Sequence, residues 1–117
     1  MPQNYSDKLK DHYRHPRDTG KLDEFTHTAE TINPLCGDET KVYLKVENGT
    51  IKDISHETRG CMICVAAASV VSEYARGKKI TDIKKIGAHE VANFLDVSIS
   101  PAREQCAMLI IKSFTSF

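Results

Sequence analysis

The chain has 117 residues, of which 40% are hydrophobic and 27% are charged. This is the composition of one ordinary globular domain, large enough to fold without help from metal or disulfides. Its 16 lysines and arginines are balanced by 16 aspartates and glutamates, which argues against a nucleic-acid binder that works by bulk positive charge. No apolar run is long enough to cross a bilayer, and residues 1–7 lack the layout of a signal peptide. We therefore expect a single domain over residues 1–117, cytoplasmic, with no nucleic-acid or membrane partner.

The first expected element is a short helix near the N-terminus. Tyr5, Leu9 and Tyr13 recur every four residues, which places them on one helical face. Asn4 stands at the position of an N-cap. Pro16 ends the helix, because the residue before a proline avoids the helical region. Residues 17–26 are expected to be a loop.

A β-hairpin is expected next. Apolar and polar residues alternate over 42–46, the pattern of a half-buried strand. Asn48-Gly49 follows and favours a two-residue turn, because both residues tolerate positive φ. The return strand is expected over roughly 51–59. Ile51 and Ile54 have opposite parity within it, which predicts a bulge or a late strand start.

After Gly60 the pattern becomes helical and continues to a stop signal at Gly77. The residues of the expected buried stripe are Ile63, Ala67, Val70, Val71 and Tyr74. Two short helices are expected near 80–86 and 88–95. Ser100-Pro101 is typical of the start of a last helix, with a hydroxyl at the N-cap and proline at the first turn. The shared face of that helix would comprise Ala102, Cys106, Leu109, Ile110 and Phe114.

A third strand near 27–33 would complete a small sheet. Strands followed by helices predict an α+β fold, in which helices pack on one face of a three-stranded antiparallel sheet.

Three of the four cysteines stand in positions that favour chemistry. Cys36 lies in a loop marked by Pro34 and Gly37, Cys61 lies at a strand-to-helix junction, and Cys106 lies in the last helix. In a reducing compartment such cysteines indicate metal or redox chemistry more than disulfides. Thiolates suit zinc and iron–sulfur units, and Asp38 could add a harder, weaker oxygen ligand.

Other interpretations of the cysteines remain open at this point. Any one cysteine is more often a buried structural residue than a ligand, and Cys106 on its apolar stripe fits that description best. Cys61 and Cys64 form a C-x-x-C pair of the kind found in thioredoxin-like proteins, but the preceding strands indicate an antiparallel hairpin instead of a βαβ unit. Cys64 could be a fourth thiolate, but we favour a space-filling role. The five histidines are scattered, and none is adjacent to a cysteine.

These motifs resemble the scaffold proteins of iron–sulfur cluster assembly, the IscU and NifU N-terminal-domain family. The similarity runs nearly end to end. The segments that carry it are Tyr5-Ser6, Asp11–Arg17, Asn33–Asp38, Arg59-Gly60-Cys61, Ala68–Glu73, Gly77-Lys78 and Gln105–Leu109.

The resemblance implies a non-catalytic scaffold that takes sulfur from a cysteine desulfurase and iron from a donor. It would assemble a transient [2Fe–2S] cluster and pass it to recipient apo-proteins. By position, the ligands of the cluster, or of zinc in its absence, would be Cys36, Asp38, Cys61 and Cys106. Cys106 would also be the candidate persulfide acceptor.

The chain departs from the family pattern in several places. Gln105 stands where many relatives have histidine before the third cysteine, which favours Asp38 as fourth ligand. Residues 99–103 only partly match the Leu-Pro-Pro-Val-Lys motif of one branch, which argues against a dedicated Hsp70-type chaperone. The alternative function is that of a zinc-dependent sulfurtransferase partner, which accepts persulfide from a desulfurase without building a cluster. The insertion typical of that branch is absent between the second and third cysteines.

Overall fold

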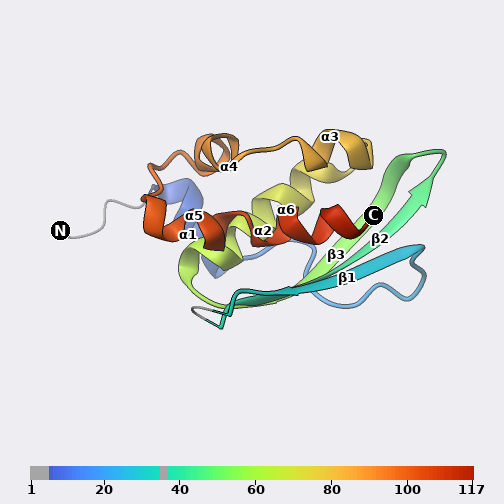
Figure 1. The fold of residues 1–117 in the computed structure, drawn as a ribbon, viewed down its shortest axis with the longest axis horizontal. Coiled ribbons are helices and arrows are strands. Elements are labelled where there is room, and N and C mark those ends of the chain that lie inside the picture. Colours follow the sequence, from blue (N-terminus) through green and yellow to red (C-terminus); the bar gives the residue numbers. More distant parts are fainter. Residues whose placement is uncertain (1–5, 35–36) are drawn as a thin grey trace.

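The computed structural model describes residues 6–34 and 37–117, and a three-stranded antiparallel sheet forms its base. Helices cover one face of the sheet (Figure 1). The expected α+β fold is therefore confirmed. Among the described helices, none is both long and apolar enough to cross a membrane.

The strands are β1 (His27–Ile32), β2 (Glu39–Glu47) and β3 (Thr50–Arg59), and they lie side by side in that order. The expected turn joins β2 to β3, with φ of 53° at Asn48 and 78° at Gly49. The expected irregularity is also present. Lys45 pairs with Asp53 and Val46 pairs with Ile51, so one residue of β3 bulges and the two isoleucines of opposite parity both reach the core.

Helix α1 (Asp7–Arg14) begins at a different residue from the one expected. Its N-cap is Ser6, whose side chain accepts a hydrogen bond of 3.0 Å from the N–H of Leu9. Asn4 and Tyr5 lie outside the described residues. Leu9 is buried as expected, but Tyr13 is 40% exposed and His12 takes its place in the interior. The buried face is rotated by one residue because His12 finds a polar partner below it.

Helix α2 (Met62–Ala75) lies at the centre of the helical layer. Ten of its fourteen residues are buried, so the expected apolar stripe was too narrow, and Tyr74 at its end is 40% exposed. The helix contacts β3 on one side and α1, α4, α5 and α6 around it, which buries nearly its whole circumference. Its small side chains, chiefly alanine and serine, permit that close packing.

The two expected short helices are present as α3 (Ile80–Lys84) and α4 (Ala88–Leu95). The expected single last helix is interrupted, because Met108 has ψ near 0° and ends one helical segment before the next begins. Cys106 and Phe114 are buried as expected, whereas Ala102 is exposed. Ser100 occupies the N-cap position but makes no capping hydrogen bond. The segments are η1 (Pro101–Arg103), α5 (Glu104–Ala107), α6 (Leu109–Ser113) and η2 (Phe114–Ser116).

A buried serine attaches the N-terminal segment to α2. Ser69 Oγ lies 2.7 Å from His12 Nδ1 and accepts a hydrogen bond of 2.9 Å from the backbone N–H of Arg17. One hydroxyl thus satisfies a buried ring nitrogen and a backbone donor. Polar groups without partners in the interior are costly, so this contact holds α1 and the following loop in place.

The substitution Ser69→Ala should destabilise the protein by about 1–3 kcal/mol, because it leaves His12 Nδ1 and the Arg17 N–H without their buried partner. Urea unfolding of the metal-free protein measures the change. Ser72→Ala is the matched control, since Ser72 Oγ is buried in the same helix and has no hydrogen-bond partner among the described residues. Equal losses in the two variants would show that the contact with α1 contributes nothing.

Candidate metal centre

Three of the four predicted ligands meet at one end of the sheet. Asp38 directly precedes β2, Cys61 is the N-cap of α2 shortly after β3, and Cys106 lies on α5. One carboxylate oxygen and the two sulfurs all lie within 4.8 Å of one another. Cys36, the fourth predicted ligand, lies outside the described residues. The described part of the site therefore combines two soft donors with one hard donor.

Strand pairing brings Asp38 and Cys61 together. Glu39 pairs with Arg59 as the last pair of the β2–β3 ladder, so Asp38 and Gly60, the residues just beyond it, face each other. Cys61 follows Gly60 directly in the chain. The backbone N–H of Cys61 donates a hydrogen bond of 3.3 Å to Asp38 Oδ1. The Asp38 side chain is buried, so its carboxylate is held against the start of α2 instead of extending into solvent.

Backbone hydrogen bonds close the loop that precedes Asp38. The N–H of Asn33 donates to the Asp38 carbonyl at 2.7 Å, and the N–H of Gly37 donates to the Asn33 carbonyl at 2.8 Å. Gly37 has φ of 76°, which glycine adopts without strain. The two ends of the loop are therefore fixed side by side at the edge of the site.

Cys106 is the more enclosed of the two described cysteine ligands. Cys106 is 4% exposed, whereas Cys61 is half-buried. Burial, together with the nearby Asp38 carboxylate and the Cys61 thiol, raises the pKa of the Cys106 thiol far above its ordinary value. A bound cation would oppose this effect, since metal ligation requires the thiolate. The Cys106 thiol is therefore protonated in the metal-free site and must lose its proton when a metal binds.

Among the described residues, the other candidates considered from the sequence do not belong to the ligand cluster. Cys64 is buried in the hydrophobic core, one helical turn beyond Cys61, which agrees with the favoured space-filling role. Gln105 is exposed. No histidine joins the potential ligand cluster among residues 6–34 and 37–117.

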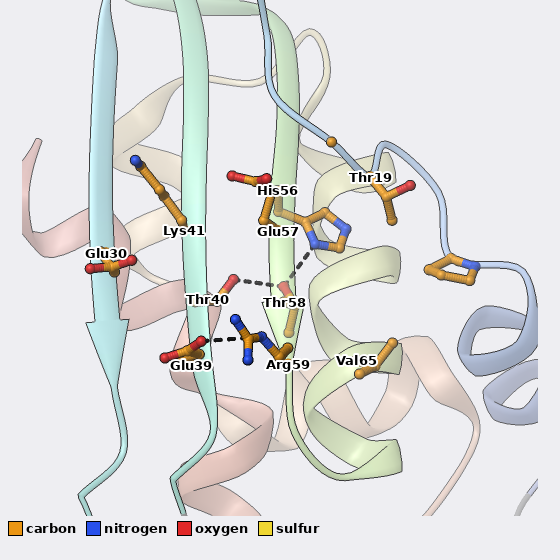
Figure 2. Close-up of a pocket in the computed structure, with 12 residues that line it drawn as sticks. Thr19, Glu30, Glu39, Thr40, Lys41, His56, Glu57, Thr58, Arg59 and Val65 are labelled. Atoms are coloured by element: carbon orange, nitrogen blue, oxygen red, sulfur yellow. Dashed lines mark hydrogen bonds and ion pairs between the residues drawn. The ribbon is translucent and has the colours of Figure 1, made fainter.

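A pocket of about 490 Å³ lies beside the centre, lined by residues of all three strands and of the loop that follows α1. Figure 2 shows its lining side chains, with the Glu39–Arg59 ion pair at one side and a chain of hydrogen bonds through Thr40, Thr58 and His56. None of the described cysteines lines it. The pocket therefore adjoins the metal centre without being part of it.

His56 is a buried polar residue that sequence reasoning did not single out. It is 1% exposed, and its Nε2 donates a hydrogen bond of 2.9 Å to the carbonyl of Arg17. Because a carbonyl only accepts, Nδ1 of the neutral ring accepts the 2.8 Å hydrogen bond from Thr58. Thr58 Oγ1 in turn lies 2.7 Å from Thr40 Oγ1. The sequence offered one indication of this burial. His56 is two residues from Ile54 on the expected strand, and residues two apart on a strand point to the same face.

The fold and this donor set define a class of small domain that can hold a soft metal centre between a sheet end and a helix start. A family model described as NifU-like N terminal domain matches residues 4–115. Because that match covers almost the whole chain, the chain belongs to the NifU-like N-terminal domain family. The resemblance found in the sequence is confirmed.

Comparisons with individual proteins agree with this assignment. The chain is 40% identical over 91 residues to iron-sulfur cluster assembly scaffold protein IscU 1 of Archaeoglobus fulgidus. That match covers 78% of this chain and 60% of the relative, so the chain spans less than two thirds of that protein. It is 33% identical over 109 residues to the scaffold protein IscU of Haemophilus influenzae, covering 90% of this chain and 85% of the relative. Both relatives are named as scaffolds, not as enzymes.

A solved structure has the same fold along almost its full length. It is a SUF-system protein from Fervidobacterium islandicum AW-1, described as a scaffold for iron-sulfur cluster assembly. The TM-score is 0.82 at 26% sequence identity, covering 96% of this chain and 94% of that one.

The metal-free protein should lose stability as the pH falls below about 6.5. Burial lowers the pKa of His56 below its ordinary value of 6.5, so the unfolded chain binds the proton first and acid favours unfolding. The His56 contribution is complete above that pH and is lost below it, with a slope of up to about 1.4 kcal/mol per pH unit.

Urea unfolding at pH 7.5, 6.5 and 5.5, with a chelator present, measures this slope. In His56→Gln the side chain keeps a donor and an acceptor but does not titrate. The slope of unfolding free energy against pH should therefore fall by up to about 1.4 kcal/mol per pH unit, the value for one bound proton. Above about pH 6.5 the difference in unfolding free energy between the two proteins should not change with pH. An unchanged slope in the variant would contradict the assignment. His12, whose pKa burial also lowers, accounts for part of any remaining slope.

Proposed function

We propose that this chain is a scaffold on which a [2Fe–2S] cluster is assembled and from which it passes to apo-proteins. The observation that carries the proposal is the convergence of Asp38, Cys61 and Cys106, whose ligand atoms lie within 4.8 Å of one another. These residues come from distant parts of the chain, and each stands in a motif that resembles the scaffold family. Membership of the NifU-like N-terminal domain family, and relatives named as cluster assembly scaffolds, support the same function.

The proposed ligand set is completed by Cys36. It is two residues from Asp38 in the chain, and covalent geometry keeps Cα atoms so separated within about 7 Å. Three thiolates and one carboxylate would then surround the cargo. Tetrahedral zinc, with bonds of about 2.0–2.3 Å, holds its ligand atoms roughly 3.3–3.8 Å apart, so a modest contraction of the described trio is sufficient.

Asp38 gives the proposed site its transient character. A carboxylate oxygen is a poorer partner for soft iron–sulfur ligation than a thiolate, so one weak bond would be present wherever the cluster is held. The carboxylate also has an alternative partner in the N–H of Cys61. A ligand that can return to a hydrogen bond lowers the cost of releasing the cargo.

The proposed partners follow from this chemistry. A cysteine desulfurase would deliver sulfur as persulfide, an iron donor would supply the metal, and apo-proteins would receive the cluster. Cys106 as persulfide acceptor remains a prediction. Its burial and raised pKa both disfavour attack on a sulfur donor while the site holds no cation, because the thiolate is the nucleophile.

Anaerobic reconstitution tests the function. The purified protein with ferrous iron, cysteine, a reductant and a desulfurase should develop iron–sulfur absorption in the visible range and transfer the cluster to apo-ferredoxin. Tightly held zinc with persulfide, and no cluster, would overturn the scaffold proposal and favour the sulfurtransferase partner.

The ligand assignment is tested in the same assay. Cys36→Ala, Cys61→Ala and Cys106→Ala should each abolish stable cluster formation, since each removes a thiolate from the proposed set. Cys64→Ala is the matched control in the hydrophobic core and should have a much milder effect. A loss in Cys64→Ala as severe as in the other three would show that the assignment is wrong.

Asp38→Ala should slow cluster release, because the variant lacks the weak ligand that can return to the Cys61 N–H and so open the cluster to the ligands of the recipient. We expect the rate of transfer to apo-ferredoxin to fall roughly tenfold. Stopped-flow or timed absorption measurements on the preloaded variant provide the rate. Faster loss of the cluster from the variant would contradict the proposed role of Asp38.

A further inference from the structure

Gly60, the residue before Cys61, has no side chain, and the Asp38 side chain fills the space that a Cβ at this position would occupy. A Cβ built on Gly60 would lie 2.5 Å from Asp38 Oδ1, 2.6 Å from Asp38 Cγ and 2.9 Å from Asp38 Cβ. Real Cβ atoms do not approach other atoms so closely. The Asp38 side chain therefore lies directly over the Cα of Gly60.

This contact is closer than ordinary strand pairing produces. Residues 38 and 60 lie one position beyond the last ladder pair, Glu39 with Arg59. Side chains at paired positions normally stand with Cβ atoms about 4.5–5.5 Å apart. At this position the carboxylate folds inward over its neighbour, and so reaches the Cys61 N–H at 3.3 Å.

Gly60 also has an unusual backbone conformation. Its φ is 155°, in a range that residues with side chains rarely adopt. The turn directs the chain from the end of β3 into the start of α2, where Cys61 is the N-cap. The same residue thus orients the Cys61 backbone and leaves room for the carboxylate.

We propose that Gly60 is a positioning residue for Asp38: the absent side chain provides the space that places the carboxylate beside the sulfurs of Cys61 and Cys106. The inference rests on the proposed metal-holding function. It deepens that function, because the position of the Asp38 carboxylate among the ligands depends on Gly60, which is not itself a ligand.

The physical consequence of adding a methyl group is specific. Rotation of the Asp38 side chain would relieve the two shortest contacts, which involve Oδ1 and Cγ. That rotation also takes the carboxylate off the Cys61 N–H and away from the sulfurs. Gly60→Ala should therefore reproduce the ligand set of Asp38→Ala while Asp38 is still present in the chain.

Zinc alone and cobalt alone are the probes. Gly60→Ala and Asp38→Ala should each lower zinc affinity by about 10- to 100-fold, measured by competition with a chelator. The double variant should bind zinc within about twofold of Asp38→Ala, because the carboxylate can be lost only once. The visible spectrum of bound cobalt in Gly60→Ala should match that of Asp38→Ala and differ from that of the original protein.

Gly77→Ala is the matched control for backbone strain. Gly77 has φ of 82°, and a Cβ there would meet nothing within 4 Å. It should lose stability in urea but keep its zinc affinity and cobalt spectrum. If Gly60→Ala alone fails to fold, the double variant should fold, because removing the Asp38 carboxylate removes the two shortest contacts.

Additive losses of zinc affinity, an unchanged affinity in Gly60→Ala, or failure of both Gly60 variants to fold would overturn the inference. Each outcome is independent of the scaffold assay. A protein that binds zinc as expected but assembles no cluster would refute the proposed function and leave the role of Gly60 intact. A normal cluster assay with additive zinc losses would do the reverse.

Discussion

The pairing of β2 with β3 is the constraint on which the site depends. Its register places Glu39 opposite Arg59 and so brings the residues just outside the ladder, Asp38 and Gly60, into direct contact. A slip of one residue would turn every side chain of the strand to the opposite face of the sheet. The hairpin turn at Asn48-Gly49 and the bulge after Lys45 are therefore also determinants of the metal centre, although both lie at the far end of the strands.

The third ligand reaches the site by a different route. Cys106 stands on a helix of only four residues, which has little stability of its own. Its position depends on the packing of α5 against α2 and of α6 against β1 and β2. Ala107, Leu109 and Ile110 are almost completely buried and provide that anchorage. Two ligands are thus placed by hydrogen-bonded pairing, and the third by hydrophobic burial.

Buried polar contacts join the N-terminal segment to the same framework. His56 links the carbonyl of Arg17 to Thr58 and Thr40, while Ser69 binds the N–H of Arg17 and the ring of His12. Thr40 and Thr58 form the ladder pair next to Glu39 and Arg59. The segment that follows α1 is therefore connected through a few hydrogen bonds to the strand ends that carry the ligands. Buried networks of this kind favour one arrangement, because partial satisfaction of their groups is costly.

Local patterns in the sequence were sufficient for most of the fold. Alternation over 42–46, the Asn48-Gly49 pair and the parity of Ile51 and Ile54 predicted the hairpin and its irregularity, because these signals act within a few residues. Ser100-Pro101 predicted where the last helical region begins. The sequence also identified Asp38, Cys61 and Cys106 as candidates, since glycine neighbours mark the first two and the family resemblance marks Cys106.

Only the tertiary structure decided the properties that depend on neighbours distant in sequence. The buried face of α1 includes His12 because Ser69 lies beneath it, and α2 is buried nearly all round because helices from both ends of the chain surround it. The raised pKa of Cys106 and the contact of Asp38 with Gly60 likewise arise from residues that meet only after folding. Hydrophobic periodicity indicates whether a segment is a helix or a strand and which of its faces is apolar, but it does not indicate which distant residues pack against that face.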